Sequence, residues 1–300
     1  MKTVVCAIDF SRYTDAVLQA GAHIANAFGG KLILFHSVPF PAEPISEIDG
    51  GIRSRMGNRR ATEARARIEE RIRGALAPYE IVIGSGDPVE ALAVISEERD
   101  ADLIVAASHR LSGIQRLLLG TIVERTARSI PTPLWVERSQ KGRSPETGFR
   151  RIVTGCSLDP SGEAVVRFAL RMARKLRAEL HLVHAAESPF NEEVIDPMNG
   201  PYTQVQDELQ RRIRRRIKEA VEELDRRAGD VHTDVLPGVP GEVLTAYAAR
   251  NQADLLVVGV RRAGVVKKTL IGSTTESLLR RSPCAVLTVP FIAGNPQARV

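Results

Sequence analysis

The stretch LIVAASHRLSGIQRLLLGT, residues Leu103–Thr121, runs from an apolar segment through a basic loop to a Gly-Thr pair. A later stretch, LLVVGVRRAGVVKKTLIGS, residues Leu255–Ser273, has the same order of apolar segment, basic loop and Gly-Ser pair. A short apolar run predicts a buried strand, and a hydroxyl residue before a new periodic segment predicts a helix start. We therefore expect the chain to build the same strand–loop–helix corner twice.

The rest of the chain is duplicated as well. The segment Asp15–His36 matches Glu163–His184 without a gap, and Gly86–Glu90 matches Gly238–Glu242. A period of about 150 residues is too long for a solenoid and indicates two copies of one domain. The predicted divisions are a first domain at 1–138, a polar linker at 139–149, a second domain at 150–290 and a tail at 291–300.

Within each copy, strand and helix patterns alternate. In the first copy we predict strands at Val4–Ile8, Leu32–Val38, Ile81–Ile83, Leu103–Ala106 and Leu134–Val136, helices at Ala16–Phe28, Arg59–Leu76, Pro88–Arg99 and Thr121–Ser129, and a loop or lid at 39–58. A second such loop is expected at 188–203, and each of the two loops either covers the cleft as a lid or is disordered. Alternation of this kind predicts an α/β fold with a parallel sheet covered by helices on both faces. Ligands of such sheets bind beyond the carboxyl ends of the strands.

The composition is that of a globular chain, with 43% apolar, 26% charged and only 4% aromatic residues. The net charge of +6 and the scarcity of aromatic residues argue against nucleic-acid binding. The basic segment Arg211–Lys218 is predicted to be a solvated helix face, because four aliphatic residues recur through it at helical spacing. These are Ile213, Ile217, Val221 and Leu224.

Several function classes are not favoured by the sequence. The three cysteines are expected to be free and to pack as small hydrophobes, which indicates a reducing compartment. Apolar runs are too short for a signal peptide or a membrane span, so we predict a cytoplasmic protein with no membrane partner. Neither a nucleophile elbow nor a P-loop occurs, and His36, His109 and His184 lack metal-ligand spacing. We therefore expect neither catalytic turnover nor a required metal ion.

The two corners have two physical uses. A helix start exposes unpaired N–H groups that bind anions, and an adjacent glycine lets the backbone approach a phosphate closely. Alternatively, Thr121–Glu124 and Ser273–Glu276 each match a capping box, in which side chains satisfy the helix start internally. The two uses are compatible, because a cap occupies only some of the free N–H groups.

These features together resemble a tandem universal stress protein. The resemblance rests on Asp-Phe-Ser after the first strand, a second strand ending in His, and the pattern G-x2-G-x9-G-[ST] after the fourth strand. It implies two copies of a five-stranded parallel sheet of order 3-2-1-4-5, of the adenine-nucleotide-binding α/β type. Some family members bind ATP through the glycine pattern, whereas others lack the pattern and bind none.

Residue by residue, the family pattern is incomplete in both copies. In the second copy Arg262 stands where the pattern has its second glycine, and in the first copy Ala107 and Arg110 replace both earlier glycines. Each arginine either clamps a phosphate through its guanidinium or fills an empty pocket. The nucleotide-binding residues that the resemblance implies are Asp9, Ser37, Arg110, Gly120 and Thr121 in the first copy, and Ala185, Gly259, Arg262, Gly272, Ser273 and Thr274 in the second.

The sequence thus leads to a non-enzymatic stress-response protein that binds ATP or AMP. Two alternatives stay open: a member that has lost the nucleotide and acts through protein contacts, and a slow ATPase. The short fifth strands, 134–136 and 285–287, are expected to lie at sheet edges, where unpaired backbone groups favour strand addition. We expect them to pair with each other, with Trp135 as an anchor, or to form a homodimer.

Overall fold

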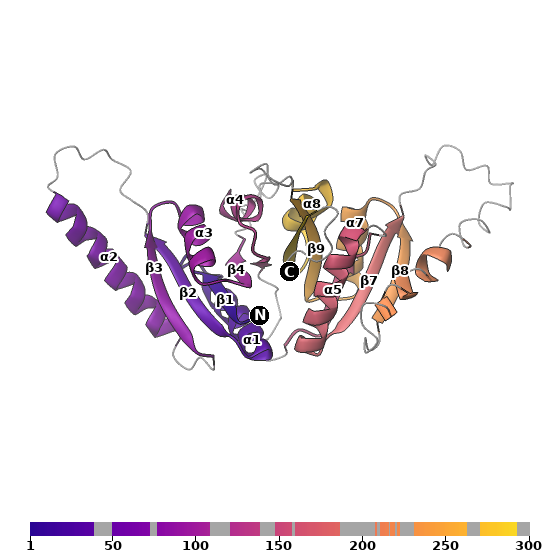
Figure 1. Cartoon of the computed structure of the whole chain (residues 1–300), viewed down its shortest axis with the longest axis horizontal. Coiled ribbons are helices and arrows are strands. Elements are labelled where there is room, and N and C mark those ends of the chain that lie inside the picture. The colour runs from indigo at the N-terminus through magenta and orange to yellow at the C-terminus, as the bar shows by residue number, and fades with distance from the viewer. Residues whose placement is uncertain are drawn as a thin grey trace. The chain divides into compact units, whose positions relative to one another are not determined.

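The structure is a computed structural model of the whole chain (Figure 1). It describes residues 1–38, 50–72, 77–108, 121–138, 148–157, 160–186, 208, 211–215, 217–219, 221–222, 231–262 and 271–292. The chain divides into two compact units, Met1–Glu146 and Thr147–Val300. Within the described ranges, no helix combines the length and the apolar character that a membrane crossing requires.

The first unit alternates strands and helices from its first residues. Its strands are β1 (Thr3–Ala7), β2 (Lys31–Val38), β3 (Tyr79–Ser85), β4 (Leu103–Ala107) and β5 (Leu134–Glu137). Its helices are α1 (Thr14–Phe28), α2 (Gly50–Arg71), α3 (Pro88–Glu98) and α4 (Thr121–Ser129). The strands follow one another in space as β3-β2-β1-β4-β5, and the neighbours pair in parallel.

The second unit repeats this order of elements. Its strands are β6 (Arg151–Gly155), β7 (Glu179–Ala186), β8 (Val231–Pro237), β9 (Leu255–Arg262) and β10 (Ala285–Ile292). Its helices are α5 (Pro160–Leu176), α7 (Pro240–Arg250) and α8 (Ser273–Arg281). The spatial order β8-β7-β6-β9-β10 is the same as in the first unit, again with parallel neighbours. The predicted α/β class with a parallel sheet is confirmed.

Aliphatic strands and right-handed crossovers explain this arrangement. Central strand residues such as Val5, Ile33 and Ile104 are fully buried, as expected for strands covered on both faces. The order reverses between β1 and β4 and between β6 and β9, so right-handed connections place successive helices on opposite faces. Each unit therefore has one switch point, at which the loops after two neighbouring strands diverge and leave room for a ligand.

Several local signals behave as predicted. Helix α1 ends at Gly29, which adopts the left-handed conformation with φ of 65°. Asp87 caps α3 by accepting hydrogen bonds from the N–H groups of Val89 and Glu90, and Pro88 occupies the first helical position. Arg125 of α4 donates two further hydrogen bonds to the Asp87 carboxylate, at 2.8 and 3.0 Å, and lowers its pKa. This contact ties α4 to α3.

Other boundaries were predicted wrongly. Helix α2 begins at Gly50, so residues 50–58 are helical and only 39–49 of the expected loop lie outside the described residues. Local sequence preferences are weak and do not fix the residue at which a helix begins. Strand β9 continues through Arg262, and β10 is eight residues long, because the two strands pair over their full length. Gly259 and Arg262 therefore belong to a strand and not to a loop.

The basic segment of the second unit is a solvated helix face, as predicted. Ile213, Ile217 and Val221 are buried, whereas the Arg212 side chain is 75% exposed and pairs with Glu208. Leu224 lies outside the described residues. The arginines are therefore the outer face of an amphipathic segment.

Candidate functional site

A pocket of about 270 Å³ lies at the switch point of the second unit. The ends of β6 and β7 contribute Gly155 and the run Val183–Ala185, and β9 contributes Gly259. The pocket opens where the carboxyl ends of these strands diverge, which is the position predicted for a ligand in such a sheet. Its volume is just below the range of about 300–1,000 Å³ that is common for small-molecule sites.

The walls of the pocket combine backbone groups with aliphatic and aromatic side chains. Helices α5 and α7 contribute Val165 and Leu244, and β10 contributes Phe291. Thr274 from the first turn of α8 and Cys156 with Ser157 after β6 supply polar atoms. This mixture of an apolar wall and a few convergent polar groups is typical of small-ligand sites.

Three of the residues predicted for the second copy line this pocket: Ala185, Gly259 and Thr274. Gly272 and Ser273 lie beside Thr274, at the exposed start of α8. The backbone of Arg262 ends β9 and pairs with Ile292, but its side chain is outside the described part of the structure. The two alternatives for Arg262, that it clamps a phosphate or that it fills an empty pocket, therefore both stay predictions.

Gly259 is packed closely against two other residues that line the pocket. A Cβ added at this position would lie 2.7 Å from the Phe291 ring and 2.8 Å from a methyl group of Val165. Its carbonyl oxygen accepts a hydrogen bond of 2.9 Å from the Thr275 hydroxyl, which anchors the first turn of α8 to the strand. The missing side chain therefore both permits this packing and keeps the back of the pocket open.

The capping box predicted at Ser273–Glu276 is wrong. The N-cap is Gly272, with extended backbone, and no side chain caps the helix start. The Glu276 carboxylate instead accepts a hydrogen bond of 2.6 Å from Arg280, one turn further along. A helix start without a side-chain cap carries N–H groups and a partial positive charge that suit an anion. In α4, Glu124 likewise pairs with Arg128, at 2.7 Å.

The first unit holds its predicted residues differently. The Asp9 carboxylate accepts a hydrogen bond of 2.9 Å from the Ser11 N–H, and the Ser37 hydroxyl donates to the Gly86 carbonyl at 3.0 Å. Both side chains thus have local structural partners. The backbone of Thr121 begins α4. Arg110 and Gly120 lie outside the described residues.

An aromatic contact covers the end of β1 in the first unit. Phe10 adopts a positive φ of 57°, an uncommon conformation for a residue with a side chain. Its ring packs against His36, with centroids 4.6 Å apart, and the Arg67 guanidinium lies 3.9 Å from its centroid. This cation–π contact lies next to Asp9, on the side where the resemblance places adenosine.

The two strand-terminal histidines have a shared structural role. His36 Nδ1 donates to the Ile8 carbonyl at 2.7 Å, and His184 Nδ1 donates to the Cys156 carbonyl at the same distance. Each bond ties the end of the second strand to the end of the first. In the sequence these histidines were weak ligand candidates. In the structure each of them donates a hydrogen bond to a backbone carbonyl.

Comparison with known proteins agrees with this architecture. The model of the Universal stress protein family matches residues 1–138 and 148–290. The Universal stress protein MJ0531 of Methanocaldococcus jannaschii is 24% identical over 148 residues, which are 49% of this chain and 85% of that protein. The Stress response protein NhaX of Bacillus subtilis is 28% identical over 160 residues, 46% of this chain and 96% of its own.

A solved structure with the same fold covers nearly the whole chain. The crystal structure of a universal stress protein from Archaeoglobus fulgidus has a TM-score of 0.71 at 20% identity. The match covers 96% of this chain and 98% of that one. With matches of the family model to both copies, the chain belongs to the universal stress protein family.

Proposed function

We propose that this chain is a non-enzymatic stress-response protein that binds an adenine nucleotide, AMP or ATP, in the switch-point pocket of its second unit. The observation that carries the proposal is the convergence of Ala185, Gly259 and Thr274 on one pocket. The resemblance suggests these three positions independently of any geometry. We also propose that each unit is a five-stranded domain of the adenine-nucleotide-binding α/β type.

The chemistry of the pocket supports each part of the ligand. Backbone at Ala185 offers an N–H and a carbonyl to the edge of an adenine ring, and Val183 and Leu244 supply apolar contact. The first turn of α8, with Thr274, offers N–H groups and a hydroxyl to phosphate oxygens. A volume of about 270 Å³ favours a ligand no larger than one mononucleotide.

The second unit is the better candidate of the two. In the first unit Ala107 stands where the second unit has Gly259, and the Phe10–Arg67 contact lies beside Asp9. We further propose that β5 and β10, the last strands of their units, provide edges for pairing within the chain or in a homodimer. A cytoplasmic location belongs to the same proposal.

Isothermal titration calorimetry with AMP, ADP and ATP tests the proposal. We expect one site per chain with a dissociation constant in the micromolar range. Correctly folded protein that binds none of the three at millimolar ligand would instead support the alternative of a member acting through protein contacts alone. Steady release of phosphate over many turnovers in a parallel assay would support the slow ATPase.

Cysteine labelling gives an independent readout of the same pocket. Cys156 lines the pocket and is half-buried, whereas Cys6 and Cys284 are fully buried. Burial also raises the pKa of the Cys6 thiol to about 12, so this thiol stays protonated and unreactive. A thiol reagent is therefore expected to modify only Cys156 in the native protein, and AMP is expected to slow that reaction. Equal labelling rates with and without saturating AMP would contradict this placement.

A further inference from the structure

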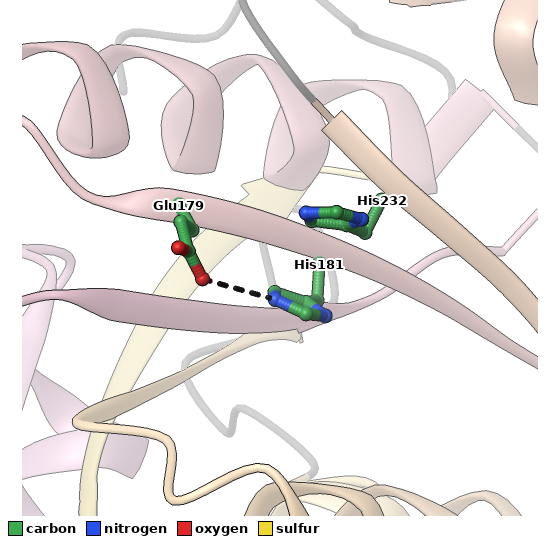
Figure 2. Close-up of side chains that lie close together, drawn as sticks. All are labelled: Glu179, His181 and His232. Carbon is green, nitrogen blue, oxygen red and sulfur yellow. Dashed lines mark ion pairs between the residues drawn. The ribbon is translucent and has the colours of Figure 1, made fainter.

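A second polar cluster lies in the second unit, on β7 and β8 and away from the pocket. Glu179 and His181 are two residues apart on β7, and His232 is the register partner of His181 on β8 (Figure 2). One oxygen or nitrogen of each residue lies within 4.8 Å of those of the other two. Glu179 and His232 are exposed, whereas His181 is only 7% exposed.

A hydrogen-bonded chain behind His181 determines which of its nitrogens carries the proton. The Tyr247 hydroxyl on α7 donates to the Asp234 carboxylate at 2.5 Å. Its oxygen therefore accepts the remaining bond, of 2.9 Å, from His181 Nδ1. The phenol stays protonated, because burial and the Asp234 carboxylate raise the pKa of Tyr247.

In the neutral imidazole the other ring nitrogen, His181 Nε2, therefore carries the lone pair. This atom is buried and has no hydrogen-bond partner among the residues that the structure describes. It points toward Glu179, whose Oε2 atom is 3.8 Å away (Figure 2). A buried lone pair without a donor is costly, and each such group requires an explanation.

The first unit shows that the fold does not need this cluster. The first-unit counterparts of Glu179, His181, His232, Asp234 and Tyr247 are Lys31, Ile33, Glu80, Val82 and Ile95. Ile33 and Ile95 are fully buried apolar residues. At the positions of His181, Asp234 and Tyr247 the second unit thus has polar side chains where the first unit has aliphatic ones, although burying polar groups costs free energy.

We propose that Glu179, His181 and His232 form a binding site for a divalent transition-metal ion of the Zn²⁺ type. Two imidazoles and one carboxylate are a ligand set that Zn²⁺ accepts, with water completing the tetrahedron. Tyr247 and Asp234 are the outer partners that orient His181 and present Nε2 to the ion. Arg151 makes both of its contacts with Glu179 to Oε2, at 2.9 and 3.0 Å, which leaves Oε1 of this exposed residue for an ion.

Metal binding requires a small local adjustment. The rings of His181 and His232 are stacked, with centroids 4.6 Å apart and planes inclined by 29°, so their lone pairs do not yet converge. Donor atoms in a tetrahedral Zn²⁺ site are about 3.3 Å apart, given bond lengths of about 2.0–2.1 Å. The exposed side chains of His232 and Glu179 close this gap by changing rotamer, while His181 stays in place. The positive charge of Arg151 nearby sets an expectation of micromolar affinity.

The test is a Zn²⁺ titration of the tag-free, full-length protein against a chromophoric chelator. We expect one Zn²⁺ per chain, and Co²⁺ in the same site is expected to show the visible absorption of a tetrahedral complex. His232→Ala, at an exposed position, removes a ligand without disturbing the core and is expected to weaken binding by at least about tenfold, by comparison with the 10–100-fold losses seen for outer-shell changes. Tyr247→Phe keeps all three ligands and is expected to weaken binding by about 10–100-fold.

His23→Ala is the matched control, since it removes a half-buried histidine from α1 in the other unit and is expected to leave both stoichiometry and affinity unchanged. Binding no tighter than millimolar in the natural chain would overturn the proposal. Stoichiometric Zn²⁺ with unchanged affinity in folded His232→Ala would overturn it as well, because the ion would then lie elsewhere.

Discussion

Gly259→Ala is expected to reduce adenine-nucleotide affinity by at least about tenfold, which corresponds to about 1.4 kcal/mol of binding free energy. The new methyl group would lie under 3 Å from both Phe291 and Val165, closer than carbon atoms pack. Both of those side chains line the pocket, so relief of the clash changes the shape of the pocket itself. Calorimetry with AMP on the variant, with its fold checked by circular dichroism, measures the effect.

Gly57→Ala is the control for this substitution. It adds the same methyl group on the exposed face of α2, where nothing lies within 4 Å of the new atom. A glycine in a helix interior costs roughly 0.5–1 kcal/mol relative to alanine, so the control is expected to be slightly more stable than the natural chain. Its AMP affinity is expected to be unchanged. If Gly259→Ala bound AMP with the same affinity as the natural chain, the nucleotide would not occupy this pocket.

The part of this architecture that local rules govern could be predicted from the sequence. Alternation of apolar strands and periodic helices indicates the α/β class, and the duplication indicates two units. Gly29 ends α1 and Asp87 caps α3 through their own backbone and side-chain chemistry, and Arg125 of α4 binds the Asp87 carboxylate in addition. The resemblance placed Ala185, Gly259 and Thr274, which the structure brings to one pocket.

Features that depend on tertiary contacts were not predictable in the same way. Val165, Leu244 and Phe291 line the pocket from three separate elements, and no spacing in the sequence connects them. The capping box was wrong because the match took Ser273 as the N-cap, whereas the N-cap is Gly272 and Glu276 pairs with Arg280. Pairing with β10 extended β9 through Arg262, and such pairing is invisible to a local pattern.

The His181 cluster is the clearest case of a candidate site that the sequence did not indicate. His181 and Tyr247 are 66 residues apart, and only the packing of α7 on β7 brings their side chains together. A usable signal did exist in the duplication itself. Comparison of the copies position by position shows His181, Asp234 and Tyr247 where the first unit has Ile33, Val82 and Ile95. Polar residues at positions that are apolar in a second copy of the same fold indicate a function added to the fold.

That substitution pattern leads to a stability prediction for the network. Tyr247→Phe alone is expected to destabilise the second unit by about 1–3 kcal/mol, because it leaves the buried His181 Nδ1–H without an acceptor. The same change in a His181→Ile, Asp234→Val background is expected to be neutral or stabilising, since the phenol hydroxyl then has no partner to lose. The phenyl ring retains the packing volume in both cases.

The measurement must report on the second unit alone. Trp135, the single tryptophan, lies on β5 of the first unit, so its fluorescence reports the unfolding of the first unit and not of the second. Hydrogen exchange of β7 and β8 amides, followed by mass spectrometry at increasing denaturant, gives the opening free energy of the relevant strands. Equal destabilisation by Tyr247→Phe in both backgrounds would mean that the hydroxyl acts through packing and not through His181. The phenol would then have no part in orienting Nε2, and the outer support proposed for the metal ligand would be lost with it.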